Sequence, residues 1–227
     1  MKTELSYSPI RPIATYSPWL QDIEFKKTHE IIRTNTLVGL YRLHELWNLV
    51  EQCVRLPGDL IEVGVWRGGT GCLMARRAQL LGSTATVFLC DSFRGVVKTS
   101  ERDGRYQGGE HADTSVSLVQ KLISDLGLAN TEILEGVFPE ETGARVADRQ
   151  FVFCHIDVDV YQSALDAIEW VWPRMPVGAV VVYDDYGFEG CDGVTRLVNE
   201  RIGLPGTLTV HNLNGHAVVV KTAEPNR

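Results

Sequence analysis

Short apolar runs alternate along this chain with longer segments of helical pattern, and this alternation constrains the fold more than any other feature. Short apolar runs rich in β-branched residues predict strands, whereas apolar residues spaced by three, four and seven predict helices. The predicted strands span 59–65, 86–91, 131–137, 151–159 and 179–185. The predicted helices among them span 69–82, 115–127, 162–172 and 192–202. Repeated strand–helix units predict an α/β fold, in which helices flank both faces of a mostly parallel sheet.

The last two apolar runs predict a β-hairpin rather than further parallel strands. They span 207–213 and 216–222, and Asn214-Gly215 lies between them. Asparagine followed by glycine suits the tight turn of a hairpin, because both residues tolerate positive φ. We therefore expect a C-terminal antiparallel element at one edge of the sheet.

The N-terminal part of the chain is predicted to be an extended arm followed by a long helix. Residues 1–21 hold three prolines among aromatic residues, and proline disrupts regular structure. The aromatic side chains favour docking of the arm on the protein body, on a second subunit or over a ligand. Residues 22–55 keep the apolar spacing of one helix. We expect a homo-oligomer whose subunit has this arm and a single domain over 22–227.

One predicted connection is long, polar and without periodicity. Residues 94–114 are rich in glycine and charged side chains. Structureless connections of this length in compact domains are usually binding loops, lids or disordered segments. We therefore predict that 94–114 form a lid over a ligand.

Composition excludes several classes of function. The chain has 227 residues and a formal net charge of −7, which disfavours nonspecific binding to nucleic acid or to an anionic membrane surface. No apolar run approaches the length of a membrane span, and the N-terminus does not have the pattern of a signal peptide. Five cysteines without C-x-x-C spacing indicate reduced thiols, so we expect a cytoplasmic protein.

A glycine-rich turn follows the first predicted strand and opens the next helix. It reads Glu62-Val-Gly64-Val-Trp-Arg-Gly68. Glycine lets the backbone turn sharply and approach a ligand closely. The spacing matches neither the dinucleotide fingerprint nor the P-loop, so the turn alone indicates only some nucleotide-like ligand.

Asp91 ends the second predicted strand, and Ser92 follows it. A carboxylate at this point can accept hydrogen bonds from the hydroxyl groups of a ribose. Alternatively, both side chains cap a turn, since aspartate and serine are good turn residues. Combined with the glycine-rich turn, Asp91 favours an adenosine-type ligand.

Four carboxylates end two of the apolar runs. Asp157 and Asp159 share one face if they continue their strand, and Asp184 and Asp185 reach one ion only if their strand ends there. Grouped acids at the carboxyl ends of parallel strands are costly without a cation, and hard divalent metals prefer oxygen ligands. We therefore predict a metal site. His155, inside the same run, is expected to be a core residue rather than a base.

Four strings of sequence together resemble the macrocin O-methyltransferase family. They are PGDLIEVGVWRGG, CDSFRG, IDVDVYQSALDAI and GAVVVYDDYG, and the likeness extends from about Trp19 to about Arg201. Members of this family methylate sugar hydroxyls during the biosynthesis of natural products such as macrolides and aminocoumarins. The resemblance is less clear over 94–114 and after Cys191, which leaves the acceptor undefined.

The resemblance implies a class I methyltransferase, a Rossmann-like fold that uses S-adenosylmethionine and Mg²⁺. It implies that Glu62 and Gly64 line the methionine end of the cofactor and that Asp91, with Ser92, lies at the ribose. It also implies roles for the four acids: Asp157, Asp184 and Asp185 bind the metal, and Asp159 is the general base.

The chemistry expected from these residues is methyl transfer to a hydroxyl. An alkyl hydroxyl is a very weak acid, so a cation that lowers its pKa and a carboxylate that takes its proton would both help. The first alternative is an enzyme with the same cofactor and metal but a catechol or other phenol as acceptor. The second is a cofactor-binding scaffold without activity, against which the complete set of acids argues.

Overall fold

The computed structural model describes residues 5–11 and 13–224 of the chain. Its centre is a seven-stranded sheet with the strand order β3-β2-β1-β4-β5-β7-β6. The first five strands in the chain are mutually parallel: β1 (Asp59–Val63), β2 (Val87–Asp91), β3 (Thr131–Glu135), β4 (Phe151–Ile156) and β5 (Val180–Tyr183). The hairpin of β6 (Thr207–His211) and β7 (Ala217–Lys221) joins β5 in antiparallel orientation. The predicted fold class and the edge hairpin are confirmed.

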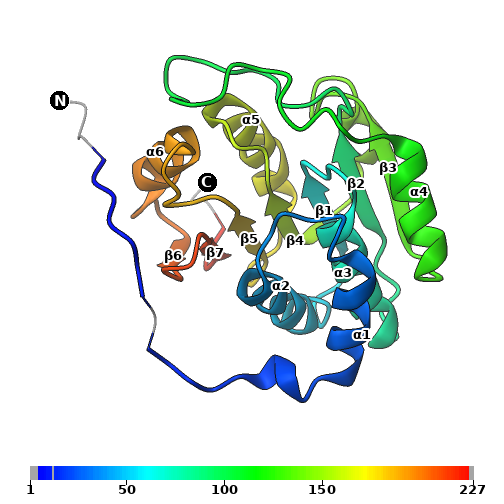
Figure 1. Cartoon of the computed structure of the whole chain (residues 1–227). Helices are drawn as coiled ribbons and strands as arrows, with labels where there is room; N and C mark the ends of the chain where they lie inside the picture. The colour runs from blue at the N-terminus through cyan, green and yellow to red at the C-terminus, as the bar shows by residue number, and fades with distance from the viewer. Residues whose placement is uncertain (1–4, 12, 225–227) are drawn as a thin grey trace.

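Helices cover both faces of the sheet (Figure 1). On one face, a core cluster joins the sheet to α1 (Ile23–Ile32), α2 (Leu40–Cys53), α3 (Gly69–Leu80) and α4 (Val116–Asp125). On the other face, a second cluster joins it to α5 (Tyr161–Val171) and α6 (Asp192–Arg201). The strands that separate the two clusters are almost wholly buried, which explains why they appear in the sequence as continuous apolar runs.

The single helix predicted over 22–55 is wrong, because the chain leaves the helix between α1 and α2. The interruption contains polar and β-branched residues and ends at Gly39, which caps α2. The Asn35 carbonyl accepts a hydrogen bond from the Gly69 amide at the start of α3. This bond holds the interruption against the start of α3, and residues 35–38 line the cleft described below.

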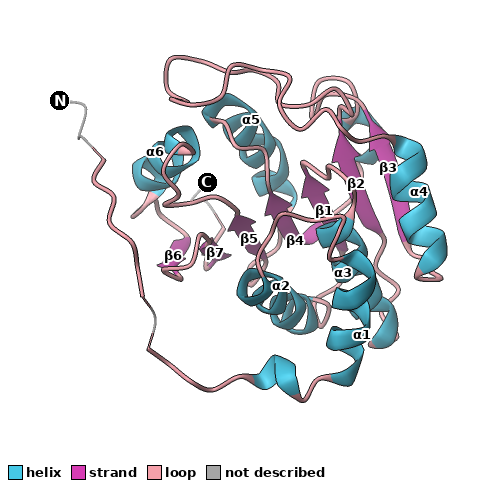
Figure 2. Cartoon of the chain, viewed as in Figure 1, coloured by secondary structure: helices cyan, strands magenta, loops and turns pink. Residues whose placement is uncertain are grey.

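The remaining elements agree with their predicted ranges, with strand ends trimmed. Short 3-10 turns at Pro18–Leu20, Gly143–Val146 and Trp172–Arg174 were not predicted. The chain from 94 to 114 contains no helix or strand and crosses one end of the sheet as a loop (Figure 2). Among the described residues, no helix combines the length and the apolar character needed to cross a membrane.

Candidate functional site

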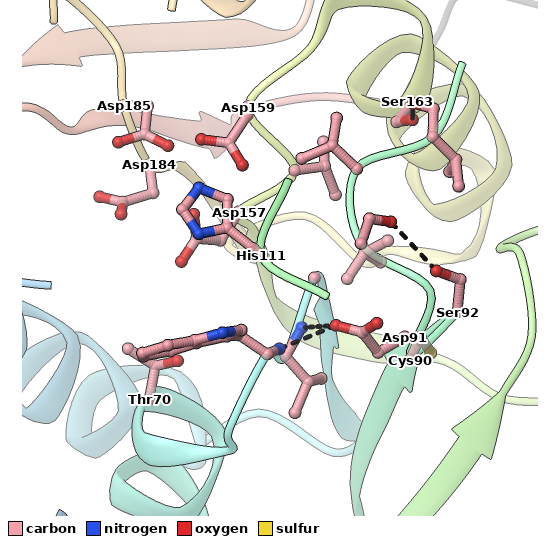
Figure 3. Close-up of a pocket in the computed structure, with 18 of the residues that line it drawn as sticks. Thr70, Cys90, Asp91, Ser92, His111, Asp157, Asp159, Ser163, Asp184 and Asp185 are labelled. Carbon is pink, nitrogen blue, oxygen red and sulfur yellow. Dashed lines mark hydrogen bonds between the residues drawn. The ribbon is translucent and has the colours of Figure 1, made fainter. Parts of the chain in front are cut away.

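A cleft of about 220 Å³ lies at the carboxyl ends of the central parallel strands. In Figure 3 its four aspartates gather on one side, and Asp91 and Ser92 lie on the other. Seven of the eight predicted site residues line this cleft: Gly64, Asp91, Ser92, Asp157, Asp159, Asp184 and Asp185. Parallel strands bring these residues together because all their carboxyl ends point toward the same edge.

Gly64 is the point of closest approach between the first turn and the end of β4. Its φ is +88°, and a Cβ atom built on it would lie 1.7 Å from the carbonyl oxygen of Asp157. Only glycine fits here, on grounds of both conformation and space. The glycine-rich turn therefore packs directly against the start of the acidic side of the cleft.

Asp91 organises the backbone around it as well as lining the cleft. Its Oδ2 accepts hydrogen bonds from the amides of Val65 and Trp66, at 2.7 and 2.8 Å, and its Oδ1 accepts one from Phe93 at 2.7 Å. The turn-capping role considered for Asp91 is therefore present. Oδ2 therefore uses both of its lone pairs, whereas Oδ1 keeps one that can accept from a ligand hydroxyl.

Glu62 is the one predicted site residue that does not line the cleft. It is fully buried beneath the cleft, and its Oε1 lies 2.8 Å from His155 Nδ1. A Cβ atom on Gly71 would approach Glu62 Oε2 to 2.4 Å, so α3 packs directly against this carboxylate. The buried His155 expected in the sequence is present, and Glu62 is its partner.

The acid group consists of Asp157, Asp184 and Asp185, whose side chains each offer an oxygen within 4.8 Å of the others. Burial, followed by repulsion from the neighbouring acids, raises the pKa of Asp157 and of Asp185 well above the usual range. Burial acts in the same direction on Asp184, but His216 and Arg42 outweigh it and lower its pKa to about 2. Full ionisation of the group is therefore unfavourable unless a cation accompanies it.

The backbone at the acid group differs from the expected strand. β4 ends at Ile156 and β5 at Tyr183, so all four aspartates follow the strands rather than belong to them. Asp159 and Asp185 have φ values of +65° and +62°. Left-handed conformations of non-glycine residues cluster at functional sites. The shared strand face assumed for Asp157 and Asp159 is therefore wrong, and the turns direct them into the cleft instead.

Two basic side chains that the sequence did not single out contact Asp184. Arg42 on α2 donates to Asp184 Oδ1 at 2.5 Å, and its Nη1 lies 3.8 Å from Asp185. His216, just before β7, places Nε2 2.9 Å from the same Oδ1 atom. Neither residue lies near Asp184 in the chain, and no motif marks them, so only the tertiary structure reveals them.

The 94–114 loop places Tyr106 and His111 at the cleft. The Tyr106 hydroxyl donates to Asp159 Oδ1 at 2.5 Å. At the C-terminal end of the loop, Asp113 accepts from Trp66 Nε1 at 2.9 Å and pairs with Arg67 at 2.5 Å. The loop thus connects the glycine-rich turn to the predicted base.

Asp103 fixes the middle of the same loop to the body of the protein. Its side chain is fully buried, and its Oδ1 accepts from the Tyr161 amide at the start of α5, at 2.6 Å. A Cβ atom on Gly193 of α6 would lie 2.0 Å from that oxygen. The loop is therefore held closely against both helices on the acidic side of the cleft.

Comparison with known proteins identifies what this chain resembles. The model of the family described as Macrocin-O-methyltransferase (TylF) matches residues 29–215. Mycinamicin III 3''-O-methyltransferase of Micromonospora griseorubida is 31% identical over 185 residues, which cover 75% of this chain and 72% of that protein. The 8-demethyl-8-(2,3-dimethoxy-alpha-L-rhamnosyl)-tetracenomycin-C 4'-O-methyltransferase of Streptomyces olivaceus is 31% identical over 184 residues, covering 75% and 69%.

Solved structures agree with the fold. The O-methyltransferase NovP superposes with a TM-score of 0.74 at 25% sequence identity, and the match covers 83% of each chain. The calicheamicin methyltransferase CalS11 superposes with a TM-score of 0.69 at 15% identity, covering 96% of this chain and 99% of that one. The seven-stranded sheet with its C-terminal antiparallel strands matches these structures, so the architecture is that of a class I methyltransferase.

Proposed function

The chain belongs to the macrocin O-methyltransferase family and is an S-adenosylmethionine-dependent O-methyltransferase, for which we propose a sugar hydroxyl as the acceptor and Mg²⁺ as the metal. The proposed reaction is transfer of a methyl group to a hydroxyl of a sugar carried by a natural product, assisted by Mg²⁺. The observation that carries this proposal is the group of four aspartates at one end of the cleft, with Asp159 beside the three acids of the candidate metal site.

The two relatives named above support a sugar as the acceptor. Their names assign them methylation at a 3'' position of mycinamicin III and at the 4' position of a rhamnosyl tetracenomycin. The charges in the cleft support the same choice on chemical grounds. A sugar hydroxyl is a far weaker acid than a phenol, and therefore gains more from a nearby cation and base. A cleft with four carboxylates suits the more demanding acceptor.

On the cofactor side, we propose that Gly64, Asp91 and Ser92 bind S-adenosylmethionine. Gly64 lines the cleft, and because it has no side chain the turn packs directly against the Asp157 backbone, so the cofactor would meet the backbone of the turn. After its three backbone bonds, Asp91 has one lone pair left, on Oδ1, for a ribose hydroxyl. Glu62 would then support the turn from below, through His155 and α3, rather than touch the cofactor.

On the metal side, Asp157, Asp184 and Asp185 fit Mg²⁺. Their donors are all carboxylate oxygens, which this ion prefers, and burial without enough positive charge leaves two of them with raised pKa values. Arg42 and His216 both contact Asp184 Oδ1, so Oδ2 of that residue is the atom left for the ion.

S-adenosylmethionine supplies an electrophilic methyl group, and a divalent cation supplies charge that lowers the pKa of a nearby hydroxyl. The residues of the chain then position the acceptor and move its proton. Asp159 takes the proton of the acceptor hydroxyl, because it adjoins the acid group and its Oδ1 already accepts a hydroxyl donor from Tyr106. The 94–114 loop acts as a lid that excludes water from the cleft.

Mass spectrometry tests this function. The metal-stripped protein is incubated with S-adenosylmethionine labelled in the methyl group, a panel of glycosylated and nucleotide-linked sugars, and Mg²⁺ or none. We expect one labelled methyl group on a sugar, only with Mg²⁺. Methylation of a catechol in a parallel panel, with no sugar product, would contradict the proposed acceptor.

We also propose that the protein is cytoplasmic and forms a homo-oligomer. All five cysteines are buried free thiols, as expected in a reducing compartment. β6 forms one edge of the sheet, and it exposes Leu208 and Val210, which are 55% and 48% accessible. Apolar side chains on an open edge favour contact with another copy. Size-exclusion chromatography with light scattering tests the oligomeric state.

A further inference from the structure

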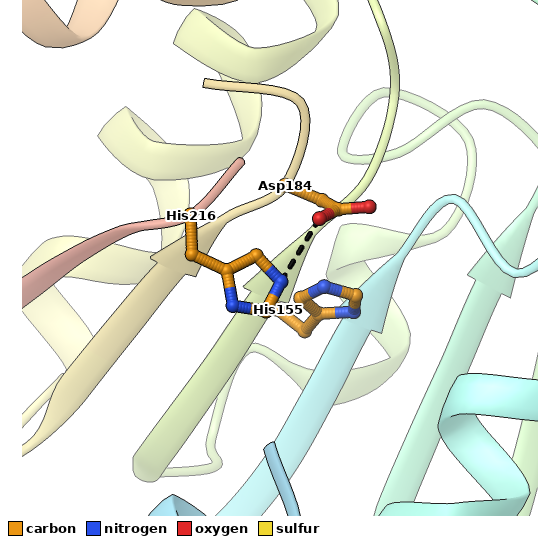
Figure 4. A group of neighbouring side chains, drawn as sticks. All are labelled: His155, Asp184 and His216. Atoms are coloured by element: carbon orange, nitrogen blue, oxygen red, sulfur yellow. Dashed lines mark ion pairs between the residues drawn. The ribbon is translucent and has the colours of Figure 1, made fainter. Parts of the chain in front are cut away.

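We propose that His155, His216 and Asp184 form a second metal site, one for a borderline transition-metal ion of the Zn²⁺ class. The three residues come from β4, from the turn before β7 and from the end of β5 (Figure 4). All three are buried, and each offers a ligand atom within 4.8 Å of the others. The site is distinct from the all-oxygen acid group and shares only Asp184 with it.

His155 provides the first argument. Its Nδ1 is bonded to Glu62 Oε1 at 2.8 Å, and both side chains are completely inaccessible to solvent. Its Nε2 is buried and has no hydrogen-bond partner among the described residues. Buried polar atoms are almost always partnered, so an orphaned nitrogen requires an explanation. A lone pair directed toward an acid and a second imidazole is what a metal ligand presents.

His216 repeats the arrangement of His155. Its Nδ1 lies 2.5 Å from Glu45 Oε2, and Asn212 donates to the same oxygen at 2.7 Å. Its Nε2 lies 2.9 Å from Asp184 Oδ1 but does not meet the geometry of a hydrogen bond to it. Such a short separation without a hydrogen bond is expected when two ligand atoms are directed at one metal ion rather than at each other.

Both histidines therefore have a carboxylate on Nδ1 and leave Nε2 for a ligand. This carboxylate–histidine pairing is the usual support of a metal-bound imidazole, because it fixes the tautomer and the ring orientation. Two imidazole nitrogens and one carboxylate oxygen suit Zn²⁺ or Fe²⁺, whereas Mg²⁺ prefers oxygen alone. The donor set therefore selects a different class of ion from the acid group.

A site without an ion would be an ion pair in which a cationic His216 bridges Glu45 and Asp184. That arrangement accounts for His216, and Arg42 would add a second cation on Asp184. It leaves His155 Nε2 without any partner, so it accounts for only half of the cluster. A bound ion accounts for both imidazoles.

Isothermal titration of the metal-stripped full chain with Zn²⁺ tests the proposal. The variants are His155→Asn and His216→Asn, since asparagine retains a donor near Nδ1 for the glutamate and removes Nε2. The matched control is His211→Asn, at an exposed histidine on β6. We expect wild type and the control to bind Zn²⁺ alike and both cluster variants to lose that binding. Glu45→Gln changes only the carboxylate beside His216 Nδ1 and should weaken Zn²⁺ affinity by about 10–100-fold.

Asp157→Asn separates this site from the proposed Mg²⁺ site. This variant should abolish the rise in melting temperature that Mg²⁺ causes and should leave Zn²⁺ binding intact. Equal Zn²⁺ affinity in wild type, His155→Asn and His216→Asn would overturn the proposal, and so would Zn²⁺ binding that only Asp157→Asn removes. Neither result affects the proposed methyl transfer, which is measured with Mg²⁺ in Zn²⁺-free protein.

X-ray absorption at the zinc edge covers the case in which the variants do not fold. It uses wild-type protein with one equivalent of Zn²⁺ and counts imidazole ligands directly. We expect two imidazoles per ion. A shell of oxygen alone, or one with sulfur from Cys191 beside Asp159 and Asp185, would overturn the assignment.

Discussion

Tyr106, in the middle of the 94–114 loop, donates a 2.5 Å hydrogen bond to Asp159, the aspartate proposed as the general base. The bond holds the loop over the acidic side of the cleft and fixes one oxygen of the base. An acceptor hydroxyl must therefore share Asp159 with Tyr106 or displace it. The lid and the proton acceptor are thus linked through a single contact.

Tyr106→Phe tests this link. Removing the phenolic donor should lower kcat/KM by about 10-fold, the value of one hydrogen bond to a charged group, while the melting temperature falls no further than in a control variant that loses a comparable bond elsewhere. Steady-state kinetics and thermal unfolding provide the two readouts. Tyr161→Phe is the matched control, because its hydroxyl donates to Glu200 at 2.6 Å on α6. Equal kcat/KM for wild type and both variants would contradict a role for the Tyr106 contact.

Mg²⁺ should stabilise the protein more at high pH than at low pH. The pKa values of Asp157 and Asp185 are raised in the folded state, by burial and then by neighbouring acids. Their contribution to stability is therefore complete when they are protonated and is lost as pH rises through the folded pKa values. Mg²⁺ binds the ionised form, so it should compensate for a loss that grows with pH.

The measurement is thermal unfolding at about pH 5.5 and about pH 8, with and without Mg²⁺. We expect a larger rise in melting temperature at the higher pH and no rise in Asp157→Asn. Chelation with EDTA should also abolish turnover, Mg²⁺ should restore it, and Ca²⁺ should do so poorly because it favours a larger, looser shell. Full turnover after exhaustive chelation would remove the metal from the mechanism.

Asp91→Asn should weaken cofactor binding and reduce stability together. Asparagine has one acceptor oxygen in place of two, so at least one of the three backbone amides loses its partner. We expect a loss of ~1.5–3 kcal/mol in affinity for S-adenosylmethionine, measured by isothermal titration.

Asp59→Asn is the control for that loss. Asp59 also accepts a backbone hydrogen bond, from Thr86 at 2.8 Å, but lies at the other end of β1 from the cleft. It should cost stability and leave cofactor affinity unchanged. If Asp91→Asn behaves in the same way, Asp91 caps the turns and does not touch the cofactor.

The sequence predicted the sheet and most of the cleft because both depend on local patterns. Buried parallel strands appear as apolar runs, and the residues that follow them meet at one edge. Asp91 and the four aspartates could be identified from this rule alone. The residues that hold them could not be identified, because Arg42, His216 and Tyr106 reach the cleft through contacts between distant segments.

The wrong predictions also arise from contacts between segments that are distant in the sequence. The break between α1 and α2 is stabilised by the bond from the Gly69 amide to the Asn35 carbonyl, and helical periodicity says nothing about such a partner. The left-handed backbone at Asp159 and Asp185 is likewise imposed by the surrounding structure. His155 was correctly predicted to be buried. That its Nε2 has no hydrogen-bond partner in the described part of the chain and that the His216 ring lies beside it are visible only in the tertiary structure.

The division of roles between Asp157 and Asp159 gives the last prediction. Asp157 belongs to the acid group with Asp184 and Asp185, whereas Asp159 contacts the 94–114 loop through Tyr106. Asp159→Asn preserves shape and removes basicity, so kcat should fall by ~10²–10⁴ while Mg²⁺ and cofactor affinities stay nearly unchanged. Asp157→Asn should instead raise the Mg²⁺ concentration required for half-maximal activity. Titrating Mg²⁺ in kinetic assays of both variants measures the two effects separately. If Asp159→Asn needs more Mg²⁺ and Asp157→Asn does not, the roles are exchanged, and if neither variant changes turnover, catalysis does not depend on this acid group.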